Sequence, residues 1–279
     1  MGNLIKYLIF TLLSASLISC DLDLTGFIRS TDRIEDRFQQ SMAYNQNNPI
    51  NHIISTEENY SVLCASDLHI GKTENAEYLF NLYENSQDLA LILNGDLVTG
   101  RKENYEVFYN LTKLVSKPLF TTAGNHELYF DGWKYYYEFF GSSTYYFVIE
   151  TPTEQDLFIC LDSGSASLGK SQIKWLEDLL KNERSKYRHC TVIGHTNMLR
   201  VKKTTTANSP SQELEYLMCL FTEYKIDLVL NGHSHSRNLT KFGNTNYVIT
   251  DPLIVGHKNA GYSKIIYKTG EIDIEFIKC

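Results

Sequence analysis

One stretch of the sequence, Leu89-Ala90-Leu91-Ile92-Leu93-Asn94-Gly95-Asp96, joins a buried strand to a polar loop. Its first half is a short apolar run, as expected of a strand that is buried on both faces. It ends at Asn-Gly-Asp, where Gly95 allows the backbone to turn. Open α/β sheets place their ligands at the carboxyl ends of strands, so we expect Asp96 in a binding site. A buried carboxylate is costly unless a positive charge meets it, and metal ions are the candidates.

Four other segments repeat this order of an apolar strand followed by a loop with Asp, Asn or His. Their loop residues are Asp67 and His69, Asn125 and His126, His195, and His233 and His235. In the first half of the chain strands alternate with helices, which predicts βαβ units. The second half mixes helices with hairpin-like strands. An α/β fold of the α+β type, with two packed sheets flanked by helices, accommodates both halves.

The composition is that of a globular protein with enough apolar and aromatic residues for a core. The 279 residues suffice for one large domain or two small ones. A net charge of −7, from 26 basic and 33 acidic residues, argues against a general nucleic-acid-binding surface, which would need a basic face. None of the six cysteines belongs to a Cys-x-x-Cys pair, which argues against a thiolate zinc site.

The N-terminal segment, residues 1–19, is predicted to be a secretory signal peptide. It holds Lys6 and then an apolar run, Tyr7 to Leu13, that is too short and too rich in serine for a membrane span. Its end, Leu17-Ile18-Ser19-Cys20, resembles the lipobox of bacterial lipoproteins, in which the cysteine carries a diacylglyceryl group. The alternative is an ordinary signal peptide with a chance cysteine, but the small residue before Cys20 favours the lipoprotein. We therefore expect a lipid-anchored protein of a bacterial cell envelope, facing the periplasm or the exterior.

Residues 20–59 form a leader before the main domain, which we place at residues 60–279. We predict a helix in this leader from Thr31 to Tyr44, with one apolar face formed by Ile34, Phe38 and Met42. The leader either packs against the main domain or serves as a tether from the membrane.

Five of the eight histidines lie in the strand-end loops. Histidines scattered at random would seldom all follow buried strands, so this pattern favours a metal site. Oxygen and imidazole ligands together suit Mn, Fe or Zn. Residues two apart in an extended segment point the same way, so the Asp67/His69 and His233/His235 pairs should each converge on one ion. Each motif is weak alone, because Gly-Asp is usually a turn and Gly-His is usually a helix cap or a core histidine.

The ordered set of five loops resembles the calcineurin-like metallophosphoesterase superfamily, over about Val62 to His235. The resemblance implies an αββα sandwich of two sheets with helices outside. It also implies two divalent transition-metal ions and a phosphate ester as substrate. The expected reaction is hydrolysis of phosphate mono- or diesters by a water that the two ions activate.

The same resemblance implies a role for each loop residue. One ion would be held by Asp67, His69 and His235, and the other by Asn125, His195 and His233. Asp96 would bridge the two, because one shared carboxylate offsets the repulsion between two cations. His126 would stand near the leaving-group oxygen as general acid or as charge stabiliser.

One position departs from the family pattern. Many phosphatases of the family have an acidic residue three positions after the bridging Asp, which orients the catalytic histidine, and here that position is Thr99. Purple acid phosphatases have a tyrosine there and lack the first histidine of the Asp-x-His pair, so Thr99 and His69 argue against that branch. Glu127 is then a candidate to support His126.

Several residues outside these loops are weaker candidates. The aromatic run Trp133 to Phe140 is either a pocket wall or a buried helix, and the buried helix is favoured. Asp162-Ser163-Gly164 also follows a strand, and we expect it to give structural support. His257 is a candidate pocket residue. Candidates to meet a phosphate are Arg101, Arg200, Lys202 and Lys203.

Two rival functions remain beside the phosphoesterase. The first is a membrane-anchored binding lipoprotein that keeps a structural metal and turns nothing over. The second is a nuclease of the same superfamily. The complete ligand set and His126 favour the enzyme over the first rival, and the acidic charge balance argues against the second.

The first prediction is that Cys20 of the mature protein carries lipid. One acyl chain binds membranes only marginally, whereas two or three hold stably. The Cys20→Ser variant should therefore be released from the membrane or left unprocessed in a fractionation assay. A soluble wild-type protein without lipid mass on its N-terminal peptide would contradict the anchor.

Overall fold

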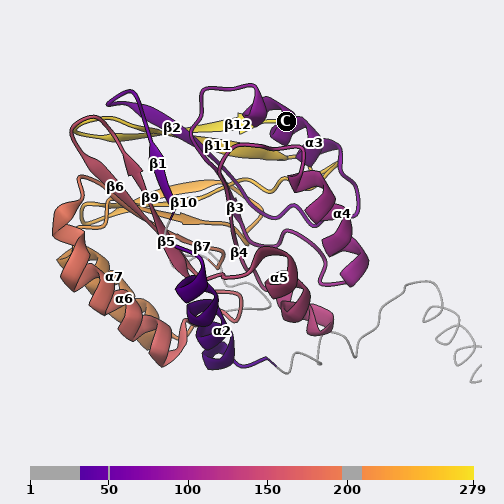
Figure 1. Cartoon of the computed structure of the whole chain (residues 1–279), viewed down its shortest axis with the longest axis horizontal. Coiled ribbons are helices and arrows are strands. Elements are labelled where there is room, and N and C mark those ends of the chain that lie inside the picture. The colour runs from indigo at the N-terminus through magenta and orange to yellow at the C-terminus, as the bar shows by residue number, and fades with distance from the viewer. Residues whose placement is uncertain (1–31, 50, 197–208) are drawn as a thin grey trace, which may run out of the picture.

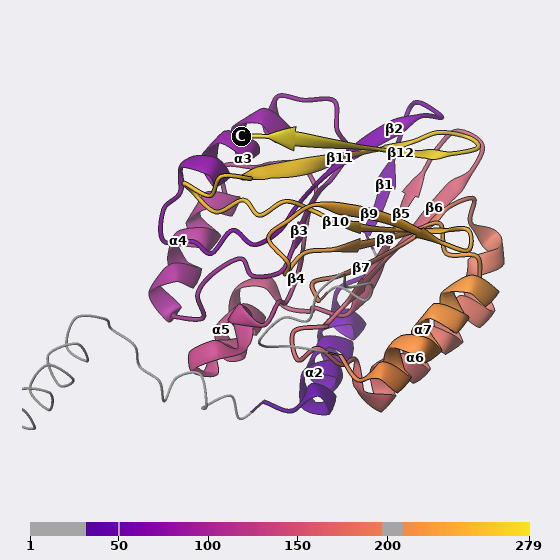
Figure 2. The same cartoon turned by 180° about the vertical axis from the view of Figure 1, so that it is seen from behind.

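The computed structural model of the chain describes residues 32–49, 51–196 and 209–279. Two β-sheets lie face to face, and helices cover the outer face of each (Figures 1 and 2). The predicted sandwich of two sheets flanked by helices is therefore confirmed. The predicted signal peptide, Cys20 and the candidates Arg200, Lys202 and Lys203 lie outside the described residues.

The larger sheet has seven strands in the order β1-β5-β6-β7-β8-β10-β9. They are β1 (Asn51–Ile54), β5 (Tyr145–Glu150), β6 (Gln155–Leu161), β7 (Cys190–Gly194), β8 (Leu228–Asn231), β9 (Asn238–Phe242) and β10 (Thr245–Ile249). The neighbours β6, β7, β8 and β10 run parallel, while β5 and β9 each join them by an antiparallel pairing. Strands β5 and β6 form one of the hairpins expected in the second half of the chain, with Tyr145 opposite Cys160.

The smaller sheet has five strands in the order β12-β11-β2-β3-β4. They are β2 (Tyr60–Ala65), β3 (Leu91–Asn94), β4 (Leu119–Thr122), β11 (Gly261–Tyr267) and β12 (Ile272–Lys278). Because β2, β3 and β4 run parallel, their carboxyl ends meet at the same edge. The polar loops predicted from the sequence leave from these ends and from the ends of β7 and β8.

The helices join the strands along the chain and cover the sheets. They are α2 (Ile34–Asn47), α3 (Glu74–Glu84), α4 (Lys102–Thr112), α5 (Trp133–Phe140), α6 (Gly169–Glu183) and α7 (Ser211–Glu223), with short 3-10 helices η1 (His126–Asp131) and η2 (Arg184–Lys186). In Figure 1, α3, α4 and α5 lie outside the smaller sheet, and α6 and α7 lie outside the larger one. The helix α2 of the leader packs beside α6 and β5.

The core has three apolar layers because the central strands are buried on both faces. Ile92 of β3 faces the other sheet, whereas Leu91 and Leu93 pack with the buried side chains of α3, α4 and α5. Trp133 and Tyr136 of α5 belong to this outer layer, so the aromatic run is mainly core, as favoured from the sequence. The burial of the Leu89–Asp96 stretch thus places the start of the Asp96 loop inside the molecule.

Aromatic rings fill much of the space between the sheets. The ring of Phe147 stacks on Phe120 with centroids 3.7 Å apart and on Phe158 at 4.6 Å. Tyr267 continues the row from Phe158 to Tyr60, with centroid distances of 5.2 and 5.0 Å. This row connects strands of both sheets and fixes their separation.

Two edge strands, β1 and β9, were missed by the sequence prediction. Their residues are mostly exposed and polar, so the alternation that marks a half-buried strand is absent. The helix predicted from Thr31 to Tyr44 continues to Asn47, and Asn51 then begins β1 and pairs in parallel with Phe147. The leader is thereby part of the larger sheet.

Phe147→Ala is expected to lower the free energy of unfolding by about 3–5 kcal/mol, because it empties the centre of the aromatic row. Urea denaturation followed by circular dichroism measures this loss. The matched control is Phe242→Ala on β9, where the ring is 48% exposed. Equal effects of the two substitutions would contradict the role given to Phe147.

Candidate metal centre

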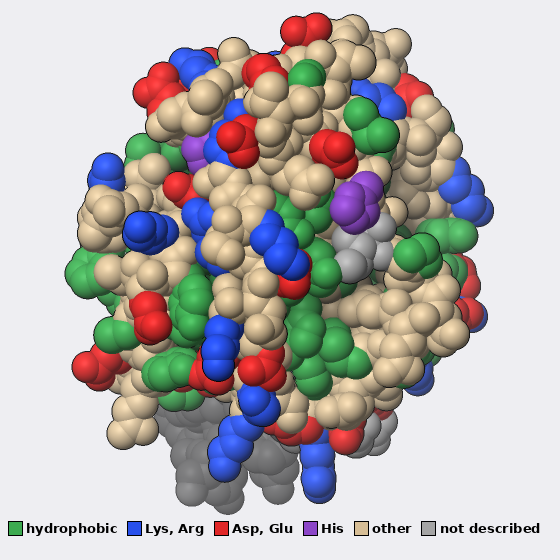
Figure 3. All heavy atoms as spheres, turned by 60° about the vertical axis from the view of Figure 1, so that its left-hand side comes forward, with side chains coloured by type: hydrophobic (Ala, Val, Ile, Leu, Met, Phe, Trp, Pro, Cys, Tyr) green, Lys and Arg blue, Asp and Glu red, His purple; other side chains and the backbone are tan. Residues whose placement is uncertain are grey.

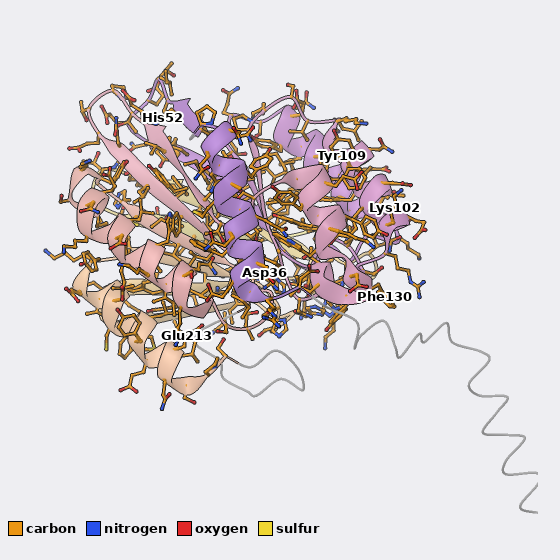
Figure 4. All side chains as sticks on the ribbon, turned by 60° about the horizontal axis from the view of Figure 1, so that its bottom comes forward. Asp36, His52, Lys102, Tyr109, Phe130 and Glu213 are labelled. Carbon is orange, nitrogen blue, oxygen red and sulfur yellow. The ribbon has the colours of Figure 1, made fainter. Side chains whose placement is uncertain are left out.

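Seven residues predicted as ligands lie at the carboxyl ends of strands from both sheets. The smaller sheet supplies Asp67 and His69 after β2, Asp96 after β3 and Asn125 after β4. The larger sheet supplies His195 after β7, and His233 and His235 after β8. Loops from both sheets therefore bring their donor side chains to the same end of the sandwich. Figure 4 shows that Phe130, in the loop after β4, lies at the opposite end of the molecule from His52, so His52 has no part in this donor set.

The backbone at most of these residues is left-handed. Positive φ angles of 53°, 44°, 50°, 68° and 49° occur at Asp67, His69, Asp96, His233 and His235. Such angles are uncommon for residues with a side chain, and each costs on the order of 1–3 kcal/mol. The expectation that the Asp-x-His and His-x-His pairs converge because they are extended is therefore wrong. The chain turns sharply at both members of each pair.

The first group of donors contains Asp67, His69 and His235, whose ligand atoms lie within 4.8 Å of one another. His235 Nε2 is 3.1 Å from Asp67 Oδ1 and 3.3 Å from His69 Nε2. Asp67 Oδ2 accepts hydrogen bonds from Ser66 Oγ and the His233 backbone N–H. These bonds leave Oδ1 to face the two imidazoles.

The second group contains Asp96, His195 and His233, also within 4.8 Å. His195 Nδ1 lies 2.9 Å from the Asn94 carbonyl oxygen and donates its proton there. Its Nε2 therefore faces Asp96 Oδ2, at 3.1 Å. A carbonyl partner on one nitrogen, with the other nitrogen aimed at a carboxylate, is typical of histidines that bind metals.

Asn125, expected from the sequence to bind with this second group, follows β4 at the same end of the sheet. Its Nδ2 donates to the hydroxyl of Tyr129 at 3.0 Å, which fixes the direction of the amide. Its Oδ1 is buried and has no hydrogen-bond partner among the residues that the structure describes. A buried amide oxygen left in this way fits a cation ligand.

Charges in the group depend strongly on one another. Burial alone would raise the pKa of Asp96, but His195 beside it holds that pKa well below its usual range. Burial would lower the pKa of His195, but Asp96 and Asp67 raise it to about 10. Burial and the neighbouring His126 lower the pKa of His69 to about 4. Metal binding displaces protons from such groups, so a cation here would take the place of the proton on His195.

The donor set as a whole fits divalent transition metals. Its inward atoms are carboxylate oxygens, one amide oxygen and imidazole nitrogens, which suit such ions better than thiolate ligands would. Among the described residues the His/Asp clusters overlap at Asp96 and at His69. The arrangement is consistent with two adjacent ions that share Asp96.

His126 lies at the edge of this donor set. It groups with His69 and Asp96 within 4.8 Å, and its Nε2 is 3.9 Å from Asp96 Oδ2. Its backbone N–H donates to Asp96 Oδ1 at 2.8 Å. The side chain is 29% exposed, whereas those of Asp67, Asp96 and His195 are buried. His126 is therefore placed to meet a molecule that arrives from solvent.

Glu127 does not support His126, contrary to one suggestion from the sequence. Its buried carboxylate accepts four backbone N–H bonds, from Asp96, Leu97, Val98 and Gly124, at 2.7–3.1 Å. Burial and the Asp96 charge raise the pKa of Glu127 to about 8, whereas the N–H donors favour its ionised form. Glu127 thus ties the Asp96 loop to the Asn125 loop.

Thr99 stands at the position where many phosphatases of the family have an acidic residue. Thr99 Oγ1 accepts a hydrogen bond from Asn104 and does not contact His126. Nδ1 of His126 has no hydrogen-bond partner within the described part of the chain. The His126 ring packs instead between His69 and Tyr129, with centroids 4.2 and 4.7 Å away.

Close backbone approach explains the glycines of the motifs. A Cβ on Gly95, whose φ is +74°, would lie 2.6 Å from His195 Cβ. A Cβ on Gly232 would overlap Ser66 Oγ. Any side chain at either position would push the loops of the two sheets apart.

Asn94 and Asn231 are functional residues that the motif analysis missed. Asn94 Nδ2 donates to the carbonyls of Gly194 and Leu230, at 3.3 and 3.0 Å, and so joins the sheets. Asn231 Nδ2 donates to Gly194 O at 2.5 Å. Both precede the glycine of an Asn-Gly-Asp or Asn-Gly-His motif, and that shared position is the signal that could have identified them.

The remaining candidates from the sequence differ in how close they lie to the donor residues. His257 lies beside the site, its ring centroid 6.1 Å from that of His235. Arg101 is exposed and stacks over Phe130 at 4.6 Å. Asp162 makes a buried ion pair with Arg37, in line with a supporting role.

Comparison with known proteins agrees with this arrangement. The family model described as "Calcineurin-like phosphoesterase" matches residues 60–237. A comparison with curated proteins gave no match.

Similar solved structures cover most of the chain at low identity. One is GAP50, the anchor in the inner membrane complex of Plasmodium, at TM-score 0.64 and 12% identity, over 80% of this chain and 85% of that one. A second is a dimetal phosphatase from Danio rerio, at 0.63 and 9%, over 78% and 96%. A third is a putative 5′-nucleotidase from Staphylococcus aureus, at 0.54 and 13%, over 79% of this chain and 53% of that one. At such identities these structures share the fold.

We expect the purified protein to bind close to two transition-metal ions per chain, and chelation to abolish turnover. Asp96→Asn should lose metal and at least about 10³-fold in rate, or ~4 kcal/mol, because it removes the charge of a buried carboxylate that belongs to the second donor group and also lies 3.8 Å from His69 of the first. Elemental analysis and steady-state kinetics measure the two effects. The control Asp178→Asn changes an exposed carboxylate on α6 and should alter neither. Full metal content and rate in a folded Asp96→Asn protein would contradict the bridging role.

Proposed function

The chain belongs to the calcineurin-like phosphoesterase family, and from this we propose that it is a dinuclear metal-dependent hydrolase of phosphate mono- or diesters. The observation that carries the proposal is the overlap of the His/Asp clusters at Asp96 and His69. A single structural metal would need one such cluster. Clusters that are linked in series through His69 and Asp96 suit a pair of adjacent ions acting on one substrate.

In this proposal each group of donors holds one metal ion. Asp67, His69 and His235 hold one ion; Asn125, His195 and His233 hold the other. Asp96 is shared. When bound, two such ions supply Lewis acidity, an activated water and neutralisation of phosphate charge. The protein contributes the fixed positions, through Ser66 on Asp67 and the Asn94 carbonyl on His195.

His126 is proposed as the general acid at the leaving-group oxygen. Its side chain is 29% exposed, and its Nε2 lies 3.9 Å from the inward oxygen of Asp96. Burial lowers its pKa, which eases loss of a proton to a departing alkoxide. Packing against Tyr129 and His69 holds the ring without the usual acidic partner.

The proposed location is the outside of a bacterial membrane, with the chain anchored by lipid at Cys20. The support is the lipobox-like sequence that ends at Cys20. Within the described residues, no helix is both long and apolar enough to pass through a membrane.

Two rival functions have weaker support. A role as a membrane-associated anchor without turnover draws support from the fold shared with Plasmodium GAP50, but such a role would not require this donor set. For a nuclease, a basic stripe would be expected along the nucleic-acid path. On the face in Figure 3, Lys and Arg side chains are interspersed with Asp and Glu.

A panel of phosphomonoesters, phosphodiesters and cyclic nucleotides, each assayed with Mn, Fe and Zn, tests the proposed activity directly. Hydrolysis that depends on added metal and disappears in Asp96→Asn is the expected result. A metal-loaded protein that hydrolyses none of these compounds would favour the non-catalytic anchor.

The role of His126 is tested by varying the leaving group. His126→Ala should slow alkyl phosphates by about 10²–10⁴-fold, the usual contribution of general acid catalysis. It should slow p-nitrophenyl esters much less, because nitrophenolate leaves without a proton. Metal content should stay near that of the wild type. Equal losses on both substrates, together with lost metal, would show instead that His126 only shapes the loop.

A further inference from the structure

The leader helix α2 buries an arginine, although the family match begins only at residue 60. Arg37 is fully buried, and its guanidinium forms a bidentate pair with Asp162, Nε to Oδ2 at 2.7 Å and Nη2 to Oδ1 at 3.3 Å. Nη2 also donates to Ser165 Oγ at 2.9 Å. All three bonds end on the loop that follows β6.

Residues 162–166 of this loop are wedged between two donor loops of the metal centre. Ser163 accepts the Thr196 backbone N–H on its Oγ at 2.9 Å and the Thr196 hydroxyl on its carbonyl at 2.8 Å. Thr196 directly follows His195. On the other side, a Cβ on Gly164 would lie 2.6 Å from the carbonyl oxygen of Gly124, which directly precedes Asn125.

The loop holds its own shape through Asp162. Asp162 Oδ1 accepts the Gly164 backbone N–H at 3.1 Å, and Gln172 of α6 binds both the N–H and the carbonyl of Asp162. The carboxylate is buried, so it needs a cation beside it. Arg37 is that cation, and without it an uncompensated buried charge would remain in the loop that contacts Thr196 and Gly124.

From this geometry we propose that Arg37 is a positioning residue for the ion held by Asn125, His195 and His233. It acts through residues 162–166, which brace the Asn125 and His195 loops, and the inference rests on the two-metal site of the proposed function. The contacts described above reach Thr196, next to His195, and Gly124, next to Asn125, and none of them reaches Asp67, His69 or His235 of the other ion. Loss of the Arg37–Asp162 contact should therefore affect one ion more than the other.

A purely structural role for Arg37 makes a different prediction. The helix α2 also docks through Glu35, whose Oε1 accepts the Lys170 and Ser171 backbone N–H groups at the start of α6. If Arg37 only docks the helix, weakening either contact should lower stability alone. If Arg37 positions the second ion, only the Arg37 variant should change metal binding selectively.

The test compares full-length variants by Mn²⁺ titration and by electron paramagnetic resonance, which distinguishes a coupled Mn²⁺ pair from a single ion. Arg37→Lys, which cannot make the bidentate contact, should weaken one of the two binding steps by about 10–100-fold, as removal of a ligand-supporting residue typically does. Its spectrum at low Mn²⁺ should be that of a single ion. Glu35→Gln is the matched control and should keep the paired signal.

Ser163→Ala is the second variant, because it leaves the Arg37–Asp162 pair in place and removes the Oγ contact to Thr196. It should weaken the same binding step as Arg37→Lys. Equal weakening of both steps in Arg37→Lys, or unchanged binding in Ser163→Ala, would overturn the proposal. Selective metal loss in a protein that hydrolyses no ester would support the positioning role and refute the proposed activity.

Discussion

The hydrogen bonds of Asn94 hold the two sheets together at the place where the donor loops meet. Its side chain, at the end of β3, reaches the ends of β7 and β8, and Thr122 of β4 donates to its Oδ1 at 2.9 Å. Its carbonyl receives His195 Nδ1 and Ser66 Oγ. The Asn94 side chain therefore joins the sheets at the site, and its backbone carbonyl orients His195 and Ser66. The rest of the site depends on these bonds.

The fold was predictable from the sequence because its central strands are short, apolar and followed by polar loops. Residues Ala90 to Asn94 are buried, as the composition of this run indicated, and Asp96 follows them into the site. Edge strands carry no such pattern, so β1 and β9 were missed. The apolar face predicted for the leader helix was only partly right, since Phe38 is buried but a charged residue, Arg37, is buried beside it.

The candidate site was predictable in its membership more than in its geometry. Side chains of the correct type recur after the strands, and topology alone brings those strand ends together. The left-handed backbone at Asp67 and His233 leaves no composition signal, because aspartate and histidine occur both in turns and in extended segments. Nothing in the sequence indicated that Glu127 joins two loops, because its partners are backbone N–H groups, which every residue except proline has.

The distribution of ligands between the sheets has a consequence for the lifetime of the protein. Each proposed ion takes ligands from both halves of the sandwich, as His69 with His235 and Asn125 with His195 illustrate. Bound metal then acts as a cross-link and stabilises the folded chain by about 2.7 kcal/mol per ion when the free ion is at a hundred times its dissociation constant. A shortage of metal would then lower the stability of the fold as well as the occupancy of the site. The chain would unfold more often, and proteases would cleave it more readily. The abundance of the protein would then follow the supply of metal.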